Sequence, residues 1–463
     1  MILQFSIKNF RSFREEQTLS MVASNRYDDH VEHLAAIPND ENKALPIAVM
    51  YGPNGAGKSN FVKALRLLES LVWNGTEPKK PIGRRAFLLD EASSKEPTEL
   101  AIQFIEGRRA YAYGCRVNDE LVVAEWLSLL QDGKEVEVFE RLTHDNGTVE
   151  IEVGDVLKDD SWGDHSKVQA LAKVSAVLPN QLFLHTIHKS VKDEEQGPVI
   201  ADVLRWFGER LTIIDPDSSS GDLARLVAMD EAFTEFAGEF LREVSTGVDR
   251  LNVETAELDE SVIGTVFGPL KSLIDKLPAG GRRIFPAPDG SQLIVEKGTG
   301  TKVRLRTLKA EHVTTEGKRV AFPFGEESDG TQRVTHLLPA LHAIRKRPRV
   351  FVIDEIDRSL HPMLAKAFVG FFLKACQGRQ SQMILTTHDI GLMDLDLLRR
   401  DELCFADKKQ DGSTELYSLS DYKVRTDLKV DKGYLQGRFG AVPFIRGLNS
   451  LVERTDTDEG RKS

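Results

Sequence analysis

One short segment, residues 52–59, restricts the possible folds of this chain more than any other. Its sequence, GPNGAGKS, matches the pattern GxxxxGK[ST] and follows the apolar run 46–51. After this segment, apolar residues recur at helical spacing, at Phe61, Ala64, Leu65, Leu68 and Leu71. A strand, a glycine turn and a helix in this order predict a loop that wraps around phosphate groups.

The residues of this phosphate loop, 52–59, have separate expected roles. Glycines tolerate the dihedral angles and the close approach that a bound phosphate requires. Lys58 is expected to reach the β- and γ-phosphates of ATP, and the Ser59 hydroxyl is expected to bind Mg²⁺. The candidate nucleotide-binding residues in and beside the loop are Gly52, Pro53, Asn54, Gly55, Ala56, Gly57, Lys58, Ser59 and Asn60.

A second candidate motif is the apolar run 349–353, which ends in two carboxylates, Asp354 and Glu355. A buried parallel strand of this kind presents its acidic residues at the carboxyl edge of a sheet. We expect Asp354 to hold magnesium, directly or through water, and Glu355 to act as general base toward the attacking water. Alone, an acidic turn after a strand is common; the phosphate loop in the same chain favours the catalytic interpretation.

The next apolar run, 383–385, is followed by Thr386, Thr387 and His388. A polar side chain at the end of a neighbouring strand can sense the γ-phosphate. His388 is therefore predicted to hydrogen-bond that phosphate or to orient the water, although an isolated histidine is more often structural. Glu355, His388 and Lys58 are the candidate catalytic residues.

Residues 327–333, ESDGTQR, precede an amphipathic helix with apolar residues at Val334, Leu337, Leu338, Leu341 and Ile344. A Ser-x-Gly sequence at a helix start offers a hydroxyl and backbone amides to an anion. The alternative is an ordinary N-cap formed by Ser328 or Asp329. We refer to 327–333 as the signature-like segment.

The chain length of 463 residues corresponds to two or three domains. The phosphate loop near 55 and the acidic strand near 354 are expected to belong to one α/β core, divided by a long insert at about 100–320. The expected segments are 1–97 with the loop, 98–152 with antiparallel strands, 153–247 as a helical insert, 248–323 as a β-rich segment, 324–450 as the second half of the core, and 451–463 as a disordered tail.

Charge and cysteine usage exclude several classes of protein. A net charge of −11 argues against a surface covered by nucleic acid, although a local basic groove with Arg108, Arg109, Lys318 and Arg319 remains open. The cysteines, Cys115, Cys376 and Cys404, form no CxxC pair. Neither a disulfide framework nor a zinc site is expected, and a reducing cytoplasm is the expected location. No apolar run reaches the roughly 20 residues of a membrane span.

At these motifs the chain resembles ABC-type ATPases, and more narrowly the SMC-like heads of bacterial abortive-infection and OLD-like (overcoming lysogenization defect) proteins. The ending 437–443, GRFGAVP, is similar to the AbiL-type subgroup. The insert resembles the family only in its layout. The segments that carry the resemblance are 7–13 (IKNFRSF), 52–59, 327–333, 354–362 (DEIDRSLHP) and 386–388.

The resemblance implies an α/β fold, a P-loop NTPase of the ABC/SMC-head type split by a mixed β-plus-helical insert. In that family two heads face each other, and the signature of one head closes on the γ-phosphate held by the other. Ser328, Gly330 and Gln332 would then act across a dimer. Asp357 would line the same interface, and Arg11 would reach the nucleotide from the first strand or lie on the surface.

Two features depart from the family pattern. The signature-like segment has ESDGTQ where the family has LSGGQ, and a Q-loop glutamine is hard to place, with Gln103 as one candidate. These departures count against coupling to a transporter and leave ATP binding unaffected.

The resemblance also implies a function: an ATPase that closes as a homodimer or higher homo-oligomer and controls an effector, a nuclease or toxin encoded nearby, with a phage protein as candidate trigger. Only about 75 residues follow His388, too few for a Toprim nuclease. Three alternatives stay open: ATP as a structural ligand of a scaffold, an SMC-like DNA-repair machine, and a transporter ATPase. Nucleic-acid binding is undecided, and no membrane contact is expected.

Overall fold

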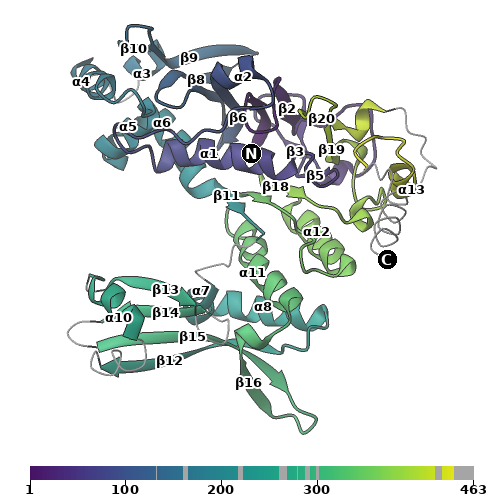
Figure 1. The fold of residues 1–463 in the computed structure, drawn as a ribbon. Coiled ribbons are helices and arrows are strands. Elements are labelled where there is room, and N and C mark those ends of the chain that lie inside the picture. Colours follow the sequence, from purple (N-terminus) through teal and green to yellow (C-terminus); the bar gives the residue numbers. More distant parts are fainter. Residues whose placement is uncertain are drawn as a thin grey trace, which may run out of the picture. The chain divides into compact units, whose positions relative to one another are not determined.

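The computed structural model describes residues 1–131, 133–159, 165–216, 223–259, 268–278, 280–286, 292–298, 302–422 and 430–442. The predicted tail 451–463 and the end of the AbiL-like segment, Pro443, lie outside these residues. The chain forms two compact units (Figure 1). The first comprises Met1–Ile213, Val352–Asp354 and Gln382–Ser463, and the second Ile214–Phe351 and Glu355–Ser381. The segment expected as one helical insert, 153–247, therefore contributes to both units.

The first unit contains a seven-stranded sheet in the order β10-β9-β8-β7-β6-β1-β2. Its neighbouring strands pair antiparallel, as the alternating patterns at 2–8 and 98–152 predict. Gly147, in the turn between β9 and β10, has a φ of 81°, which is the conformation that the Asn-Gly signal requires. The strands are β1 (Ile2–Lys8), β2 (Gln17–Ser20), β6 (Thr98–Glu106), β7 (Arg109–Val117), β8 (Val122–Gln131), β9 (Lys134–Thr143) and β10 (Val149–Val153).

A second sheet, in the order β11-β17-β18-β5-β19-β20, carries the predicted motifs. Strand β5 lies between β18 and β19 and is parallel to both. Every residue of β5, β17 and β18 is buried, which explains their continuous apolar runs. Because β5 and β18 are parallel, their carboxyl ends lie at the same edge of the sheet. The phosphate loop, after β5, and residues 386–388, at the end of β18, therefore lie at that edge. The strands are β5 (Ile47–Tyr51), β11 (Leu211–Ile214), β17 (Val350–Ile353), β18 (Gln382–Thr386), β19 (Leu403–Lys408) and β20 (Thr414–Ser418).

The side chain of Gln382, on β18, joins the two sheets of the first unit. Its Nε2 donates to the carbonyl oxygens of Ile2 at 3.0 Å and Leu45 at 2.9 Å, and its Oε1 accepts from the amide of Ile2 at 2.5 Å. Helix α1 (Lys58–Trp73) packs against the antiparallel sheet, where Phe61 meets Phe5 edge to face at 5.5 Å. Gln382 is fully buried, so an apolar residue here would leave backbone groups unpaired.

Shorter elements complete the first unit, and the helices expected between about 165 and 213 are present. Helix α5 packs against α1 and α4, and the π-helical turn η3 extends α6. The remaining elements are η1 (Val31–His33), β3 (Ala35–Ala36), β4 (Lys43–Ala44), α2 (Glu91–Lys95), α3 (Asp155–Asp159), α4 (His165–Ala176), α5 (Phe183–Ser190), η2 (Asp193–Glu195), α6 (Gly197–Arg205), η3 (Trp206–Arg210), η5 (Ile390–Leu392), η6 (Arg400–Glu402), η7 (Leu419–Asp421) and α13 (Val430–Leu435).

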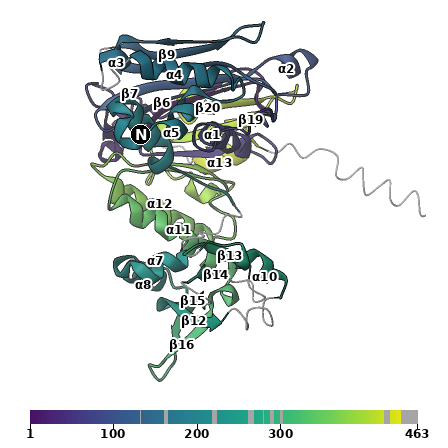
Figure 2. The same ribbon diagram turned by 90° about the vertical axis from the view of Figure 1, so that its left-hand side faces the viewer.

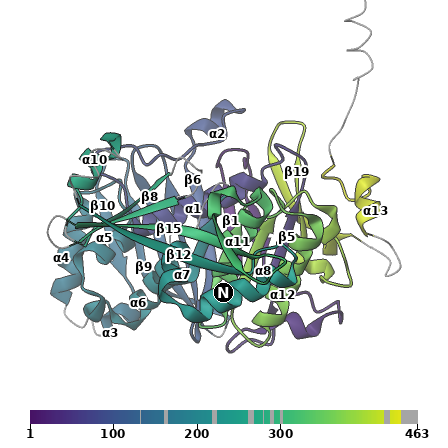
Figure 3. The same cartoon turned by 90° about the horizontal axis from the view of Figure 1, so that it is seen from below.

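The second unit is built on a sheet in the order β12-β15-β14-β13, with β16 also paired to β15. Figure 3 shows β12 and β15 as long neighbouring strands. A short helix, α10 (Gly268–Asp275), was not expected from the sequence, and its Ile274 packs with Phe285 and Val295 of the sheet. The strands are β12 (Arg250–Asp259), β13 (Arg282–Pro286), β14 (Gln292–Lys297), β15 (Lys302–Val313) and β16 (Arg319–Pro323).

Four further helices lie in the described part of the second unit. Helices α7 (Leu223–Met229) and α8 (Glu231–Glu243) contact each other and strand β12 (Figure 2). The turn η4 (Phe324–Glu326) leads toward α11 (Asp329–Ile344), which packs against α8 and α12 (Pro362–Cys376). Among the residues described in both units, no helix is long and apolar enough to cross a membrane.

Candidate nucleotide-binding site

The turn between β5 and α1 brings the backbone of 52–57 very close to its neighbours. A Cβ on Gly52 would lie 2.2 Å from the carbonyl oxygen of Ala406, and a Cβ on Gly57 would lie 2.2 Å from Oγ1 of Thr414. Gly57 has a φ of 115° and is the N-cap of α1, without any side-chain bond to the first amides. These amides carry the positive end of the helix dipole. An anion can take the place of the missing cap, so the loop fits a phosphate group.

The tip of the phosphate loop is more exposed to solvent than its base. Asn54 and Gly55 are exposed and Pro53 is half-buried, whereas Ala56 is buried. The amide of Ala56 donates to the carbonyl oxygen of Pro53 at 3.2 Å and closes the turn. The predicted loop residues thus form one continuous turn, with its base held inside the unit.

The ammonium group of Lys58 lies inside this turn. Nζ donates to the carbonyl oxygen of Gly52 at 2.7 Å and to Nε2 of His388 at 3.0 Å. Lys58 is only 5% exposed, whereas His388 is exposed at the end of β18. Two of the three candidate catalytic residues therefore meet directly at the base of the loop.

The other polar groups of the site converge on the carboxylate of Asp354. Its Oδ1 accepts from the Ser59 hydroxyl at 3.2 Å and from the Thr386 hydroxyl at 2.5 Å, and the residue is buried. Ser59 is the second residue of α1, Asp354 follows β17 and Thr386 ends β18. Carboxylate and hydroxyl oxygens are ligands that Mg²⁺ prefers, so the pair Ser59 and Asp354 fits a magnesium site.

Sequence motifs did not identify the residues that support the loop from behind. Nδ2 of Asn60 donates to Oγ of Ser12 at 2.8 Å, and the hydroxyls of Ser12 and Thr414 are 2.7 Å apart. The Thr414 hydroxyl donates to the carbonyl oxygen of Ala56 at 2.7 Å. Ser12 lies within the quoted segment 7–13, but nothing in the sequence around Thr414 indicates its contact with the loop.

Arg11 was expected to reach the nucleotide. Its backbone has a φ of 54° and its amide donates to the carbonyl oxygen of Arg85 at 2.6 Å. Its guanidinium lies 5.6 Å from the ring centre of Phe10, and burial, followed by repulsion from Arg85, lowers its pKa. Gln103, the Q-loop candidate, lies on β6 opposite Gln4 and Ala112, in the antiparallel sheet.

The signature-like segment forms the start of α11 in the second unit. Ser328 is the N-cap, and its Oγ accepts from the amide of Thr331 at 3.2 Å, so the ordinary capping role is present. Gln332 donates from its side chain to the carbonyl oxygens of Gly325 and Glu327, at 3.2 Å and 2.8 Å. A Cβ on Gly330 would lie 2.8 Å from the carbonyl oxygen of Ser359.

The two acidic candidates after β17 also belong to the second unit. Glu355 is half-buried with a φ of 51°, and its carbonyl oxygen accepts from the amide of Arg358 at 3.1 Å. Asp357 accepts through its carbonyl oxygen from the amide of Leu360 at 3.1 Å. The first unit therefore brings together Lys58, Ser59, Asp354, Thr386 and His388. Glu355, Asp357 and the candidates of the signature-like segment lie in the second unit.

Three of the four basic residues considered for a nucleic-acid groove have acidic partners. Arg109 contacts Asp202 at 2.9 Å. Arg319 contacts Asp249 at 2.8 Å, and Lys318 contacts Glu316 at 3.3 Å. These pairs neutralise much of the positive charge that such a groove would need.

Comparison with known protein families gives a match across much of the chain. A family model described as "AAA domain, putative AbiEii toxin, Type IV TA system" matches residues 47–394, which include the phosphate loop, the signature-like segment, Asp354 and His388. No curated protein sequence matches the chain.

Structural neighbours include an SMC head domain from Thermotoga maritima, with 13% identity and a TM-score of 0.36, covering 90% of this chain and 98% of that chain. Another is an Smc head domain with an extended coiled coil, bound to the C-terminal domain of ScpA and derived from Pyrococcus furiosus, with 14% identity and a TM-score of 0.36, covering 94% of this chain and 98% of that chain. No residue role is transferred from either.

The α/β P-loop NTPase fold predicted from the sequence is confirmed, and in it the phosphate loop and the acidic strand share one sheet although a long insert separates them. The family match covers well over half of the chain. The chain belongs to the AAA-domain family that is described by reference to the AbiEii toxin of type IV toxin–antitoxin systems.

Proposed function

We propose that this protein binds ATP with Mg²⁺ at the phosphate loop of its first unit and hydrolyses the nucleotide. The convergence of Lys58, Ser59, Asp354 and His388 at the start of α1 carries this proposal. A helix N-terminus without a side-chain cap, a buried ammonium and a carboxylate–hydroxyl pair match the three parts of a triphosphate site: amides, cation and metal ligands.

Each residue of the site has a distinct proposed role. Lys58 exchanges its contacts with Gly52 and His388 for phosphate oxygens, because an anion is a stronger partner for an ammonium group than neutral acceptors. Ser59 and Asp354 would hold Mg²⁺, which neutralises phosphate charge when bound. His388 then orients the water or the γ-phosphate, and Glu355 takes the proton of the attacking water.

We further propose that two copies close head to head around ATP. Ser328, Gly330 and Gln332 at the start of α11 would face the γ-phosphate of the other copy, with Asp357 lining that interface. The support is the family resemblance of the signature-like segment and the exposure of Ser328 despite its capping bond. Arg11 would contribute from the end of β1.

The biological role that we propose is control of a partner effector, a nuclease or toxin encoded nearby, in abortive-infection defence against phage. The support is the family description, which refers to a toxin of a type IV toxin–antitoxin system, together with the resemblance to AbiL-type and OLD-like proteins. We place the protein in a reducing cytoplasm, because its three cysteines, Cys115, Cys376 and Cys404, are buried and form no CxxC pair. Sequencing the neighbouring open reading frames would identify the effector.

Substitution of Lys58 tests the nucleotide site. Lys58→Ala is expected to weaken ATP binding by at least about tenfold, because the buried cation of the loop is lost. Lys63→Ala is the matched control, since Lys63 lies on the same helix but is exposed. Isothermal titration calorimetry with a non-hydrolysable ATP analogue measures both. Equal affinity in Lys58→Ala and wild-type protein would refute the assignment.

Substitution of Glu355 distinguishes an ATPase from an ATP-bound scaffold. If hydrolysis is required, Glu355→Gln binds ATP normally, loses turnover by about 100-fold or more and loses phage protection. If the variant protects cells fully while turnover is negligible, ATP serves as a structural ligand and hydrolysis is incidental.

A further inference from the structure

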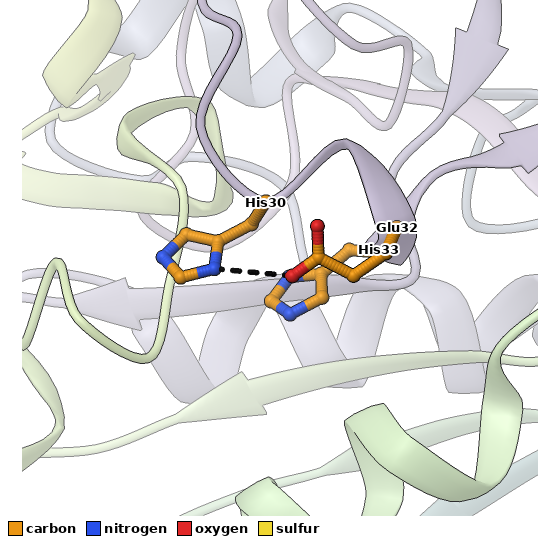
Figure 4. Close-up of side chains that lie close together, drawn as sticks. All are labelled: His30, Glu32 and His33. Carbon is orange, nitrogen blue, oxygen red and sulfur yellow. Dashed lines mark ion pairs between the residues drawn. The ribbon is translucent and has the colours of Figure 1, made fainter.

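Two histidines and a glutamate gather around the turn η1 of the first unit, outside the nucleotide site. Figure 4 shows the ring of His30 facing the carboxylate of Glu32, with His33 beside it. Nδ1 of His30 lies 3.5 Å from Oε1 of Glu32. The three residues offer one ligand atom each within 4.8 Å of one another. Two imidazoles and a carboxylate are a donor set for divalent transition metals.

The outer nitrogen of each ring is already bonded to an oxygen. Nε2 of His30 lies 2.8 Å from the carbonyl oxygen of Leu395, and Nδ1 of His33 lies 3.3 Å from Oε1 of Glu402. With these nitrogens as donors, the tautomers present the lone pairs of His30 Nδ1 and His33 Nε2. Histidine ligands of metals almost always donate their other ring nitrogen to a carboxylate, carbonyl or water in this way.

The supporting carboxylate is itself held firmly. Glu402 is fully buried, and its second oxygen accepts from the amide of Arg399 at 2.7 Å. His33 is 8% exposed, whereas the side chain of Glu32 is 54% exposed. The cluster thus combines one buried histidine, one half-buried histidine and one exposed carboxylate, so an ion can enter from solvent.

We propose that His30, Glu32 and His33 form a binding site for a divalent transition metal of the Zn²⁺ class, with water completing the coordination. Zinc bonds of about 2.0–2.1 Å place tetrahedral ligand atoms about 3.3 Å apart, so the side chains must close by up to about 1.5 Å. The two rings stack at 4.9 Å and 13°, and therefore one must also turn. The cysteine count predicted no zinc site, but this donor set contains no cysteine.

All three proposed ligands come from the turn at 30–33, and the hydrogen bonds of the two histidines join this turn to a distant part of the first unit. The turn at 30–33 follows β2, and Leu395 and Glu402 lie between the end of β18 and the start of β19. An ion bound only by the folded chain stabilises it in proportion to the logarithm of metal concentration. The ion would therefore stabilise the turn at 30–33 and fix its two histidine rings, independent of the proposed nucleotide chemistry.

Metal titration of the full-length, chelator-treated protein tests the site, at pH 7.5 without nucleotide or Mg²⁺. We expect one Zn²⁺ per chain by calorimetry, a tetrahedral Co²⁺ absorption band, and a higher melting temperature with Zn²⁺. Glu32→Gln and His30→Ala should each weaken Zn²⁺ binding by about tenfold or more. His144→Ala is the control, since His144 forms an exposed pair with Glu150 at 2.9 Å.

Two results would overturn the proposal: wild-type protein that takes up no stoichiometric Zn²⁺, or a loss in His144→Ala equal to that in Glu32→Gln. Glu32 is exposed, so its substitution leaves the fold intact, and circular dichroism verifies this. Asp354→Asn should bind Zn²⁺ as wild type does, which separates this site from the magnesium site at the phosphate loop.

Discussion

Nζ of Lys58 lies 3.0 Å from Nε2 of His388, although 330 residues separate them in the chain. Lysine has no acceptor, so the imidazole must accept through Nε2 and carry its hydrogen on Nδ1. The contact exists because β5 and β18 are parallel neighbours, with Met50 beside Thr386 at their carboxyl ends. The phosphate-binding lysine and the histidine proposed to sense phosphate therefore form one unit.

His388→Ala should impair turnover more than binding. Loss of a positioned imidazole typically costs 10²–10⁴-fold in a hydrolytic step, and we expect ATP turnover to fall by about 100-fold while the Kd for ATP changes only a few-fold. His388→Gln, which retains an N–H, should recover part of the rate. Steady-state phosphate release and equilibrium ATP binding measure the two effects, and wild-type turnover in His388→Ala would exclude the proposed role.

Thr414→Val tests the support behind the loop. The variant keeps the shape but loses the hydroxyl that donates to Ala56, so we expect about 1 kcal/mol less stability and a severalfold higher KM for ATP. Thr18→Val is the control, because its hydroxyl pairs with Ser6 at 2.7 Å on exposed strands. A KM that changes equally in both variants would show that Thr414 does not position the loop.

Ser328→Arg tests head-to-head closure. We expect this variant to bind ATP but to lose turnover. Ser328→Ala is the control, because it removes only the N-cap, which costs about 1 kcal/mol of stability, and adds no bulk at the interface. In the proposed dimer each ATP site takes its phosphate loop from one copy and its signature-like segment from the other. A mixed dimer of Ser328→Arg and Lys58→Ala protein therefore has both substitutions in one site and none in the other. About a quarter of wild-type turnover should then return at equal mixing. No recovery, with mixed dimers demonstrated, would remove the two-headed model.

His336 predicts a pH dependence of stability. Burial, and then the charge of Arg333, lower its pKa to about 4, and its ring meets Phe324 edge to face at 5.6 Å. The unfolded chain takes up this proton near pH 6.5 and the folded chain near pH 4, so the free energy of unfolding should fall as pH drops through that window. The contribution is up to about 3 kcal/mol.

Urea denaturation at pH 7.0, 5.5 and 4.5 measures the effect of His336. The His336→Leu variant should lose less stability on acidification than the wild type, because it binds no proton at this position. Parallel pH profiles of the two proteins would show that the ring is not buried in its neutral form.

The amino-acid sequence alone determined the local features of this protein. The phosphate loop, the start of α1, the acidic strand and the N-cap at Ser328 depend on residues within a few positions of one another, and periodicity and turn chemistry report such features directly. The AAA-family core and the candidate metal and phosphate ligands followed from these motifs. Helix α10 was missed because it has only 8 residues and begins with Gly268 and Pro269, a pair that is typical of turns.

Only the tertiary structure decided which distant residues meet. The contacts of Asp354 with Thr386, of Lys58 with His388 and of Thr414 with Ala56 depend on the strand order β17-β18-β5-β19-β20. Strand order depends on which apolar faces are buried together, and the same apolar runs would be compatible with several different orders. No local pattern around Thr414 or His30 therefore shows its contact with Ala56 or Leu395, since these partners lie hundreds of residues away in the chain.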